Sequence, residues 1–289
     1  MRRPLIALIG SSGQVGSAIL QKAGYVQRIK TRLDHTRAKL KDELESISPD
    51  IIINAGAYTD VDLAETNQPT CFAVNTSGVS LLIEYCMVND CRLIHFSSDY
   101  VFNGQKSDSY KESDSPGPAN IYGWSKYFAD QLILGSKIRA NILRPSWVMG
   151  PRHTNFVHKI LSLGMMKDSL HIISDQIGRP TSSDLLADSA LWLATNDIQE
   201  SLIHVSDDGV PSSWYAIATH AFAYAQDLGY RGLMVENVYP IASKDYKTPA
   251  IRPKNSLLDC SLFEETIAIE RGNWTQTVED IVREASHGW

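Results

Sequence analysis

A tyrosine and a lysine stand four residues apart in PANIYGWSKYFAD (118–130), where the sequence has the pattern of a helix. Residues four apart share one face of a helix, so Tyr122 and Lys126 are expected to be neighbours. A phenol with a pKa of about 10 is a poor acid or base at neutral pH, and a nearby ammonium group would lower that pKa. The pair could therefore transfer a proton to or from a substrate oxygen.

Two serines close the apolar run RLIHFSS (92–98), which predicts a buried strand. Reduction of a ketone needs a proton for the developing alkoxide and a hydrogen bond that polarises the carbonyl. Ser98 could donate that hydrogen bond, whereas a single serine at a strand end is usually only a polar terminus. The combination of Ser98, Tyr122 and Lys126 predicts a site that reduces a carbonyl group.

A glycine-rich segment, GSSGQVG (10–16), lies between an apolar strand and a helical stretch. Gly10, Gly13 and Gly16 permit a tight turn and a close approach of backbone N–H groups to a pyrophosphate at the helix N-terminus. In this context the segment predicts a dinucleotide site rather than a turn without a ligand.

The cofactor type depends on the residues after the second expected strand, where the chain reads QRIKTRLD (27–34). A carboxylate at this strand end would favour NAD, whereas basic groups suit the 2′-phosphate of NADP. Lys30 and Arg32 therefore favour NADP(H). NAD(H) stays an alternative because Asp34 would take this place if the strand ended later, and two solvated cations without a ligand are an equal alternative.

The expected elements place these residues at one edge of a sheet. Strands at 5–10, 51–56, 92–98 and 140–146 alternate with helices at 14–23, 70–88 and 120–137, which predicts a Rossmann-type, doubly wound parallel sheet. Further helices are expected at 154–167, 184–195, 212–228 and 275–286, and strands at 170–173, 202–205 and 233–238. We expect a dinucleotide-binding domain at 1–150. Residues 151–289 would form mainly a smaller substrate lobe, with some elements within about 170–205 returning to the main sheet.

Composition excludes several classes of function. The chain of 289 residues has a formal net charge of -6 and no basic tract, which argues against a nucleic-acid partner. The cysteines (Cys71, Cys86, Cys91 and Cys260) lack metal-like spacing and are expected to be reduced thiols. The apolar run in MRRPLIALIG is too short for a signal or a membrane span. We therefore expect a cytoplasmic protein with no membrane partner and no metal site.

Several longer motifs resemble one family. The GxxGxxG spacing is similar to that of extended short-chain dehydrogenases, and the serine, tyrosine and lysine resemble their catalytic triad. The further motifs are ISPDIIINAGAYTDVDLAE (47–65), HFSSDYVFNG (95–104), NIYGWSK (120–126), LRPSWVMG (143–150), SDQIGRPTSSDLLAD (174–188) and KTPAIRPKNSLLDCSLF (247–263). Together they resemble dTDP-4-dehydrorhamnose reductases. The resemblance implies NADPH-dependent reduction of the 4-keto group of dTDP-4-dehydro-L-rhamnose to dTDP-L-rhamnose.

The resemblance also implies roles for individual residues. Ser98, Tyr122 and Lys126 would be catalytic, and Arg252 would meet the nucleotide or hold the C-terminal lobe in place. The cofactor would contact Gly13, Gln14, Val15, Ala57, Tyr58 and Thr59, and the sugar would contact Val61, Ser98, Tyr100 and Trp147. Ser98 replaces the usual threonine. Ser17 stands where the bacterial reductase tends to carry a glutamate. Some members bind magnesium at a dimer interface through acidic residues, so Ser17 argues against that metal and that dimer; a homodimer stays an open alternative.

The same scaffold could also carry other activities. Ser98 is followed by Asp99 and Tyr100 without a glutamate, which counts against a 4,6-dehydratase. A 4-ketoreductase or epimerase for another nucleotide sugar remains an alternative. The NADP-binding regulatory subunit of methionine adenosyltransferase resembles the same family, but Trp147 and the DQIGRPT segment favour the reductase. The isolated histidines, His95 among them, are interpreted as structural.

Overall fold

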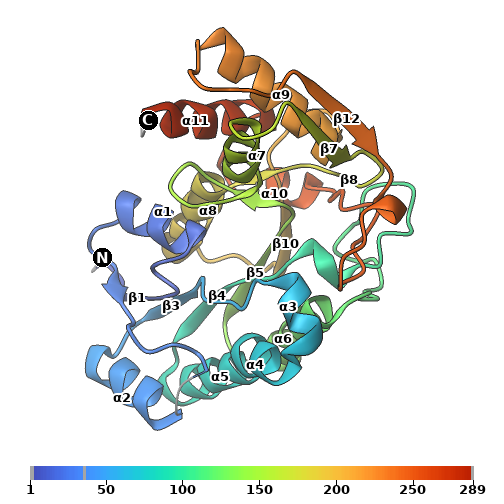
Figure 1. Ribbon diagram of the computed structural model, residues 1–289. Helices are drawn as coiled ribbons and strands as arrows, with labels where there is room; N and C mark the ends of the chain where they lie inside the picture. Colours follow the sequence, from blue (N-terminus) through green and yellow to red (C-terminus); the bar gives the residue numbers. More distant parts are fainter. Residues whose placement is uncertain (1–2, 35–36, 288–289) are drawn as a thin grey trace.

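A six-stranded parallel sheet organises the computed structural model, which describes residues 3–34 and 37–287 (Figure 1). The strand order is β10-β5-β4-β3-β1-β2. The strands are β1 (Ile6–Ile9), β2 (Gln27–Arg28), β3 (Ile51–Asn54), β4 (Arg92–Phe96), β5 (Ala140–Pro145) and β10 (Leu202–Val205). Apart from the short, exposed edge strand β2, the strands are mostly apolar and buried, which is typical of parallel strands that are covered on both faces. The predicted α/β fold with a doubly wound sheet is confirmed.

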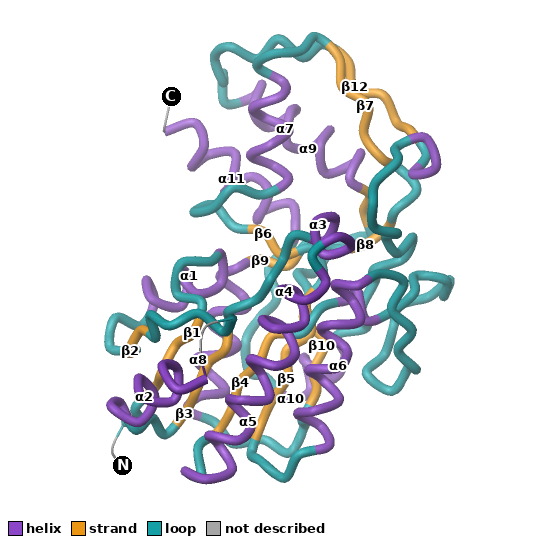
Figure 2. The backbone as a smooth tube through the Cα atoms, turned by 60° about the horizontal axis from the view of Figure 1, so that its bottom comes forward, coloured by secondary structure: helices purple, strands orange, loops and turns teal. Residues whose placement is uncertain are grey.

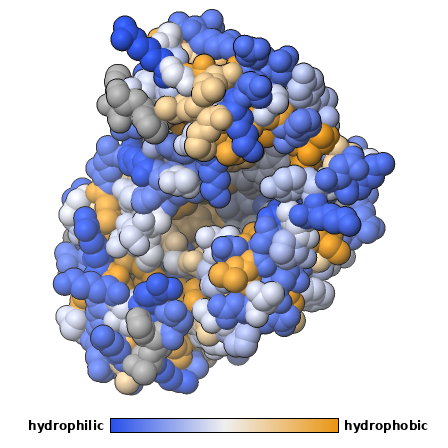
Figure 3. Space-filling model, viewed as in Figure 1, coloured by the Kyte–Doolittle hydropathy of each residue, from blue (hydrophilic) through white to orange (hydrophobic). Residues whose placement is uncertain are grey.

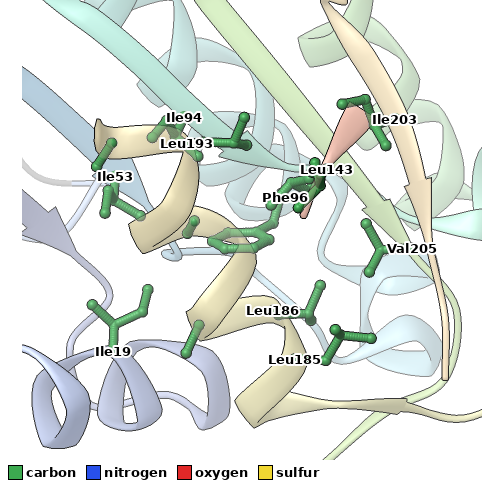
Figure 4. Packing of buried hydrophobic residues seen from close by; sticks show 14 of the residues in the cluster. Ile19, Ile53, Ile94, Phe96, Leu143, Leu185, Leu186, Leu193, Ile203 and Val205 are labelled. Carbon is green, nitrogen blue, oxygen red and sulfur yellow. The ribbon is translucent and has the colours of Figure 1, made fainter. Parts of the chain in front are cut away.

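Helices cover both faces of this sheet (Figure 2). On one face lie α1 (Gln14–Lys22), α8 (Ser183–Thr195) and α10 (Ser261–Thr266). Figure 4 shows Ile19 of α1 and Leu186 of α8 packed against Phe96 of β4. On the other face lie α2 (Arg37–Ile47), α5 (Gly78–Asn89) and α6 (Ile121–Gly135). The reacting residues predicted on α6 are therefore held directly against the sheet.

One long helical stretch leads into α5. It consists of α4 (Gln68–Phe72), the π-helical turn η1 (Ala73–Ser77) and α5, and it follows the short helix α3 (Val61–Thr66). Residues Gln68–Asn89 are long and apolar enough to cross a membrane by length and composition, but half of the apolar window is buried inside the structure. Burial against the sheet accounts for its apolar composition.

The second half of the chain forms a lobe beyond the carboxyl ends of the strands (Figure 1). We call this the C-terminal lobe: α7 (Phe156–Gly164), α9 (Trp214–Asp227) and α11 (Trp274–His287), with β7 (Ser169–Ile173) paired in parallel to β12 (Asn237–Ile241). Smaller pairs join β6 (Val148–Met149) to β9 (Thr181–Ser182) and β8 (Ile177–Gly178) to β11 (Ser212–Ser213). The turns η2 (Asp99–Val101) and η3 (Ser243–Asp245) complete the elements.

Several predicted boundaries are corrected. The strand expected at 233–238 lies at Asn237–Ile241, because the backbone N–H groups of Met234 and Val235 donate to Gly164 O in a turn before β12 begins. The helix expected at 212–228 begins at Trp214. Helices α2, α3 and α10 were not predicted; α2 buries only Leu40 and Leu44, which is a weak apolar pattern.

The second half also contributes to the main sheet. Strand β10 pairs in parallel with β5, and α8 packs against α1. The division at residue 150 stays a prediction, and its outer limits at residues 1 and 289 lie outside the described residues. All four cysteines are buried and free.

Candidate active site

The glycine-rich loop packs so tightly that side chains are excluded at two positions. Gly10 has a φ of +76°, and a Cβ there would lie 2.4 Å from Gly56 N. A Cβ on Gly16 would lie 2.1 Å from Gly10 O. At Gly13, in contrast, the nearest atom to a Cβ is 3.6 Å away, and α1 begins there without a side-chain cap. The N–H groups at the start of α1 therefore suit an anionic group, and the loop fits a pyrophosphate.

Other residues predicted to bind the cofactor lie around this loop. Gln14 Nε2 donates to Val148 O at 3.4 Å, and Val15 packs against the core cluster beneath α1. Ala57 and Thr59 are exposed after β3. The backbone of Tyr58 exchanges two hydrogen bonds with the Asn75 amide, at 2.8 and 3.0 Å.

The two cations predicted to select NADP lie on the surface. Strand β2 ends at Arg28, so Asp34 does not occupy the strand end. The backbone N–H of Lys30 donates to Glu43 Oε1 at 2.7 Å, and the residue is exposed. Arg32 Nε lies 3.2 Å from Asp34 Oδ1, and the Arg32 side chain is 73% exposed.

The three residues predicted to react are brought together and buried. Ser98, Tyr122 and Lys126 are 7%, 9% and 2% exposed. Asn120 is the N-cap of helix α6, and its side-chain oxygen accepts a hydrogen bond from Gly123 N at 2.8 Å. Sequence spacing predicted the helix that Tyr122 and Lys126 share. Strand β4 ends at Phe96 rather than at the predicted residue 98, and Ser98 instead caps the turn η2, which meets the start of α6 only in the tertiary structure.

The electrostatics of Tyr122 differ from the prediction. Burial raises its pKa above the usual value, and the hydrogen bond with Ser98 acts in the opposite direction. The Tyr100 ring lies edge-on at 5.5 Å. The expected net lowering of this pKa by Lys126 is wrong for this structure, because the loss of hydration outweighs the favourable contacts.

Lys126 makes its contacts with β4 rather than with the phenol. Its Nζ donates to Phe96 O at 2.6 Å and lies 3.3 Å from His95 Nε2. Burial lowers the pKa of Lys126 to about 8, while Asp130 acts to raise it. The amine is therefore poised to change charge near neutral pH.

A buried ion pair beneath the reacting residues was missed at the level of sequence. Asp130 and Arg144 form a pair at 2.8 Å, with side chains 0% and 2% exposed. Ser97 Oγ donates to the same carboxylate at 2.5 Å, and Arg144 contacts His204 at 3.2 Å. The only available signal was a set of polar residues inside apolar segments, which periodicity alone does not interpret.

Asn75 was also missed. It lies in the π-helical turn, a feature that often marks functional sites. Its amide donates to Ser125 Oγ at 2.9 Å and holds the backbone of Tyr58. It thereby ties the loop after β3 to the catalytic helix.

Trp147 is placed at the base of the C-terminal lobe. It is 9% exposed, has a φ of +44° and stacks on Trp214 with ring centroids 3.9 Å apart. A Cβ on Gly178 would come within 2.8 Å of the indole, so this glycine gives it room. With Trp214 against it, only part of the indole is left for a sugar.

Arg252 joins the segment before α10 to α3. Both Nη atoms bind Asp62, at 2.9 and 2.8 Å, and the guanidinium lies near enough to Tyr100 to act on its pKa. Val61 begins the same helix, so Val61, Tyr100 and Arg252 lie on adjoining elements. A cavity of about 640 Å³ is lined by Arg252, Lys254 and the 103–107 loop.

Figure 3 shows that the surface is hollowed between the C-terminal lobe and the sheet.

Ser17 contacts a histidine and the backbone of its own helix. Its hydroxyl lies 2.9 Å from His153 Nε2 and donates to Gln14 O. Within residues 3–34 and 37–287 no group of three or more His, Cys, Asp or Glu side chains has metal-binding geometry. The magnesium question stays a prediction.

Comparisons with known proteins cover almost the whole chain. The model of the RmlD substrate binding domain matches residues 3–287. A dTDP-4-dehydrorhamnose reductase of Sinorhizobium fredii is 34% identical over 288 aligned residues, covering 96% of each protein. That of Aggregatibacter actinomycetemcomitans is 33% identical, covering 96% of this chain and 97% of the relative. The crystal structure of the Bacillus anthracis reductase in complex with NADP is 27% identical, with a TM-score of 0.89 and coverage of 98% and 100%.

Proposed function

We propose that this chain, which belongs to the RmlD substrate binding domain family, uses NADPH to reduce the 4-keto group of dTDP-4-dehydro-L-rhamnose to dTDP-L-rhamnose. The observation that carries the proposal is the buried group of Ser98, Tyr122 and Lys126 beside a loop that fits a pyrophosphate. Lys30 and Arg32 would meet the 2′-phosphate of NADP. NADH is the alternative cofactor.

In the proposed reaction NADPH supplies the hydride, and the protein supplies the proton and its control. Tyr122 donates its proton to the carbonyl oxygen at C4, and the Ser98 hydroxyl orients that oxygen. Lys126 in its ammonium form stabilises the phenolate that remains. The burial that raises the pKa of Tyr122 keeps it protonated at neutral pH until the oxygen of the substrate takes the proton.

The sugar and the nucleotide would lie on the other side of Tyr122. Tyr100, Val61 and the accessible part of Trp147 would contact the sugar. Arg252 and Lys254 line the cavity beside Tyr100, and their positive charges suit a diphosphate. We place the nucleotide there.

The proposal extends to a homodimer in the cytoplasm. Trp124, Phe128 and Leu132 follow each other at a spacing of four on α6 and are 39%, 42% and 42% exposed. Such a stripe would support a homodimer, which light scattering would detect. We place the protein in the cytoplasm, with no nucleic-acid or membrane partner.

The test is NADPH oxidation with dTDP-4-dehydro-L-rhamnose, followed for the wild type, Tyr122→Phe and Tyr127→Phe. Loss of the Tyr122 hydroxyl should lower kcat at least about 10²-fold, since the proton donor is removed. Tyr127, on the same helix, is the control and should keep activity. If the wild type binds NADPH but turns over neither this sugar nor other 4-keto nucleotide sugars, the enzyme proposal fails and an NADP-binding regulatory subunit takes its place.

A further inference from the structure

A line of buried contacts connects the cofactor loop to Lys126. Gly56, which lies against Gly10, donates its N–H to Asn54 Oδ1 at 3.1 Å. Asn54 Nδ2 lies 3.1 Å from His95 Nδ1, and His95 Nε2 lies 3.3 Å from Lys126 Nζ. Asn54 and His95 are directly opposite each other in the β3–β4 register, and each is 1% exposed. The proposed reaction gives no role to Asn54 or His95, the two residues that link the loop to Lys126.

The hydrogen-bond directions along this line determine the tautomer of His95. Because the Gly56 N–H must meet an acceptor, the Asn54 amide presents its oxygen to Gly56 and its Nδ2 to His95. An amide nitrogen is only a donor, so His95 Nδ1 must be an acceptor. The single proton of the neutral imidazole is then on Nε2, the atom that faces Lys126. Burial and the nearby amine of Lys126 lower the pKa of His95 well below its usual value, so the ring stays neutral.

We propose that His95 is a positioning residue for Lys126: held by Asn54 with its proton on Nε2, it directs an N–H group at the amine and so favours the neutral amine over the ammonium ion. Phe96 O, as the acceptor at 2.6 Å, fixes where Nζ lies. Burial and this contact together make Lys126 a group that exchanges its proton near neutral pH. This inference rests on the proposed function only for the consequence that activity falls when Lys126 is neutral.

Other groups around Lys126 act with or against His95. Asp130, one turn further along α6, favours the ammonium form, as does Cys71 of α4 where it is ionised, but burial raises the pKa of that thiol. Asp130 is already paired with Arg144 of β5, which offsets its charge. Tyr122, on the same helix as Lys126, is kept neutral by its raised pKa. Burial is the largest cause of the lowered pKa of Lys126, and the neutral His95 ring, through its Nε2–H, acts in the same direction as burial.

The tautomer can be measured without substrate. In protein labelled with ¹⁵N-histidine, two-bond ¹H–¹⁵N spectra distinguish the two neutral tautomers and the imidazolium form. The signal of His95 is assigned by its loss in His95→Gln, or in His95→Asn if the first variant does not fold. We expect a proton on Nε2 throughout the neutral range. A proton on Nδ1, or on both nitrogens, would overturn the inference even if the enzyme were a reductase.

The second readout is the pH dependence of kcat/KM, which reports groups of the free enzyme. In the wild type it should fall as Lys126 loses its proton, near the pKa of about 8. A glutamine at position 95 places an amide near the Nε2 position, and its oxygen accepts a hydrogen bond from the ammonium ion. The alkaline limb in His95→Gln should therefore move upward by about one pH unit.

His204→Gln is the matched control for this readout. His204 is equally buried, lies on β10 and contacts Arg144 instead of Lys126. Its replacement should leave the alkaline limb where it is in the wild type. An unchanged limb in His95→Gln, or equal shifts in both variants, would contradict a specific role for His95.

Discussion

Two arginine–aspartate pairs with the same closest distance show how differently one interaction can serve in this molecule. Asp130 and Arg144 join α6 to β5, and Asp62 and Arg252 join α3 to the segment before α10; both pairs have an Nη2–Oδ2 distance of 2.8 Å. The side chains of the first pair are 0% and 2% exposed. Those of the second are 34% and 24% exposed.

Solvent decides what each pair can do. In a buried pair neither ion can regain hydration, so separating the two is costly and the pair holds its elements in one geometry. A partly exposed pair is screened, and either partner can exchange its contact for water or another ion at little cost. The first pair therefore suits a position between α6 and β5, where it fixes the catalytic helix on the sheet. The second suits a surface where Arg252 must be able to meet an anionic substrate.

The largest expected difference between the pairs is in stability. Asp130→Asn leaves the Arg144 charge buried and unpaired, and should lower the free energy of unfolding by about 3–5 kcal/mol. Asp62→Asn should lower it by less than about 1 kcal/mol, since Arg252 can turn to water. Urea denaturation of both variants measures the difference. Equal losses would mean that burial does not separate the two pairs.

The next effect concerns binding of the nucleotide sugar. Arg252→Ala should raise KM for the sugar nucleotide about tenfold with little change in kcat, because a charge-assisted bond to the substrate is lost in both ground and transition states. Steady-state kinetics at saturating NADPH measure this change. Arg152→Ala, which removes another partly exposed arginine paired with an aspartate, is the control. A fall in kcat with unchanged KM would instead place Arg252 at the reacting centre.

The smallest effect is expected at Lys30 and Arg32, which are more exposed than either pair. Replacing both with alanine should raise KM for NADPH about fivefold, the size of a screened ion pair, and leave KM for NADH unchanged. Arg139→Ala, which removes an exposed arginine just before the amino end of β5, is the control. If the two cofactors were affected equally, these cations would contribute only to the general surface charge.

The sequence motifs predicted the parallel sheet and the family, and both are confirmed. The tight glycine turn is present, and its role in binding the cofactor stays a prediction. The apolar runs of β1, β3, β4 and β5 are short and sharply bounded, so these strands can be predicted from the sequence. Helix α2 was missed because it presents few apolar residues to the core. The strand near 233–238 was misplaced because apolar residues there serve a turn that packs on α7.

The site was only partly predictable for a related reason. Ser98, Tyr122 and Lys126 stand in recognisable local motifs, and the structure brings them together; their roles stay predictions. His95, Asp130 and Arg144 are separated along the chain, and nothing in their spacing shows that they meet. From the helix spacing, the sequence also predicted a lowered pKa for Tyr122, which is wrong. The spacing shows that Lys126 is a neighbour, but it does not show the burial that raises this pKa.

The sequence by itself determined which chemical groups are present and the local geometry that depends on short spacing: the glycine turn before α1, and a phenol and an amine on one face of α6. Only the tertiary structure decided the charge state of those groups. That state depends on burial and on partners from other strands, such as His95 beside Lys126. Electrostatic interactions act through space, and the low-dielectric interior that strengthens them exists only once the chain has folded.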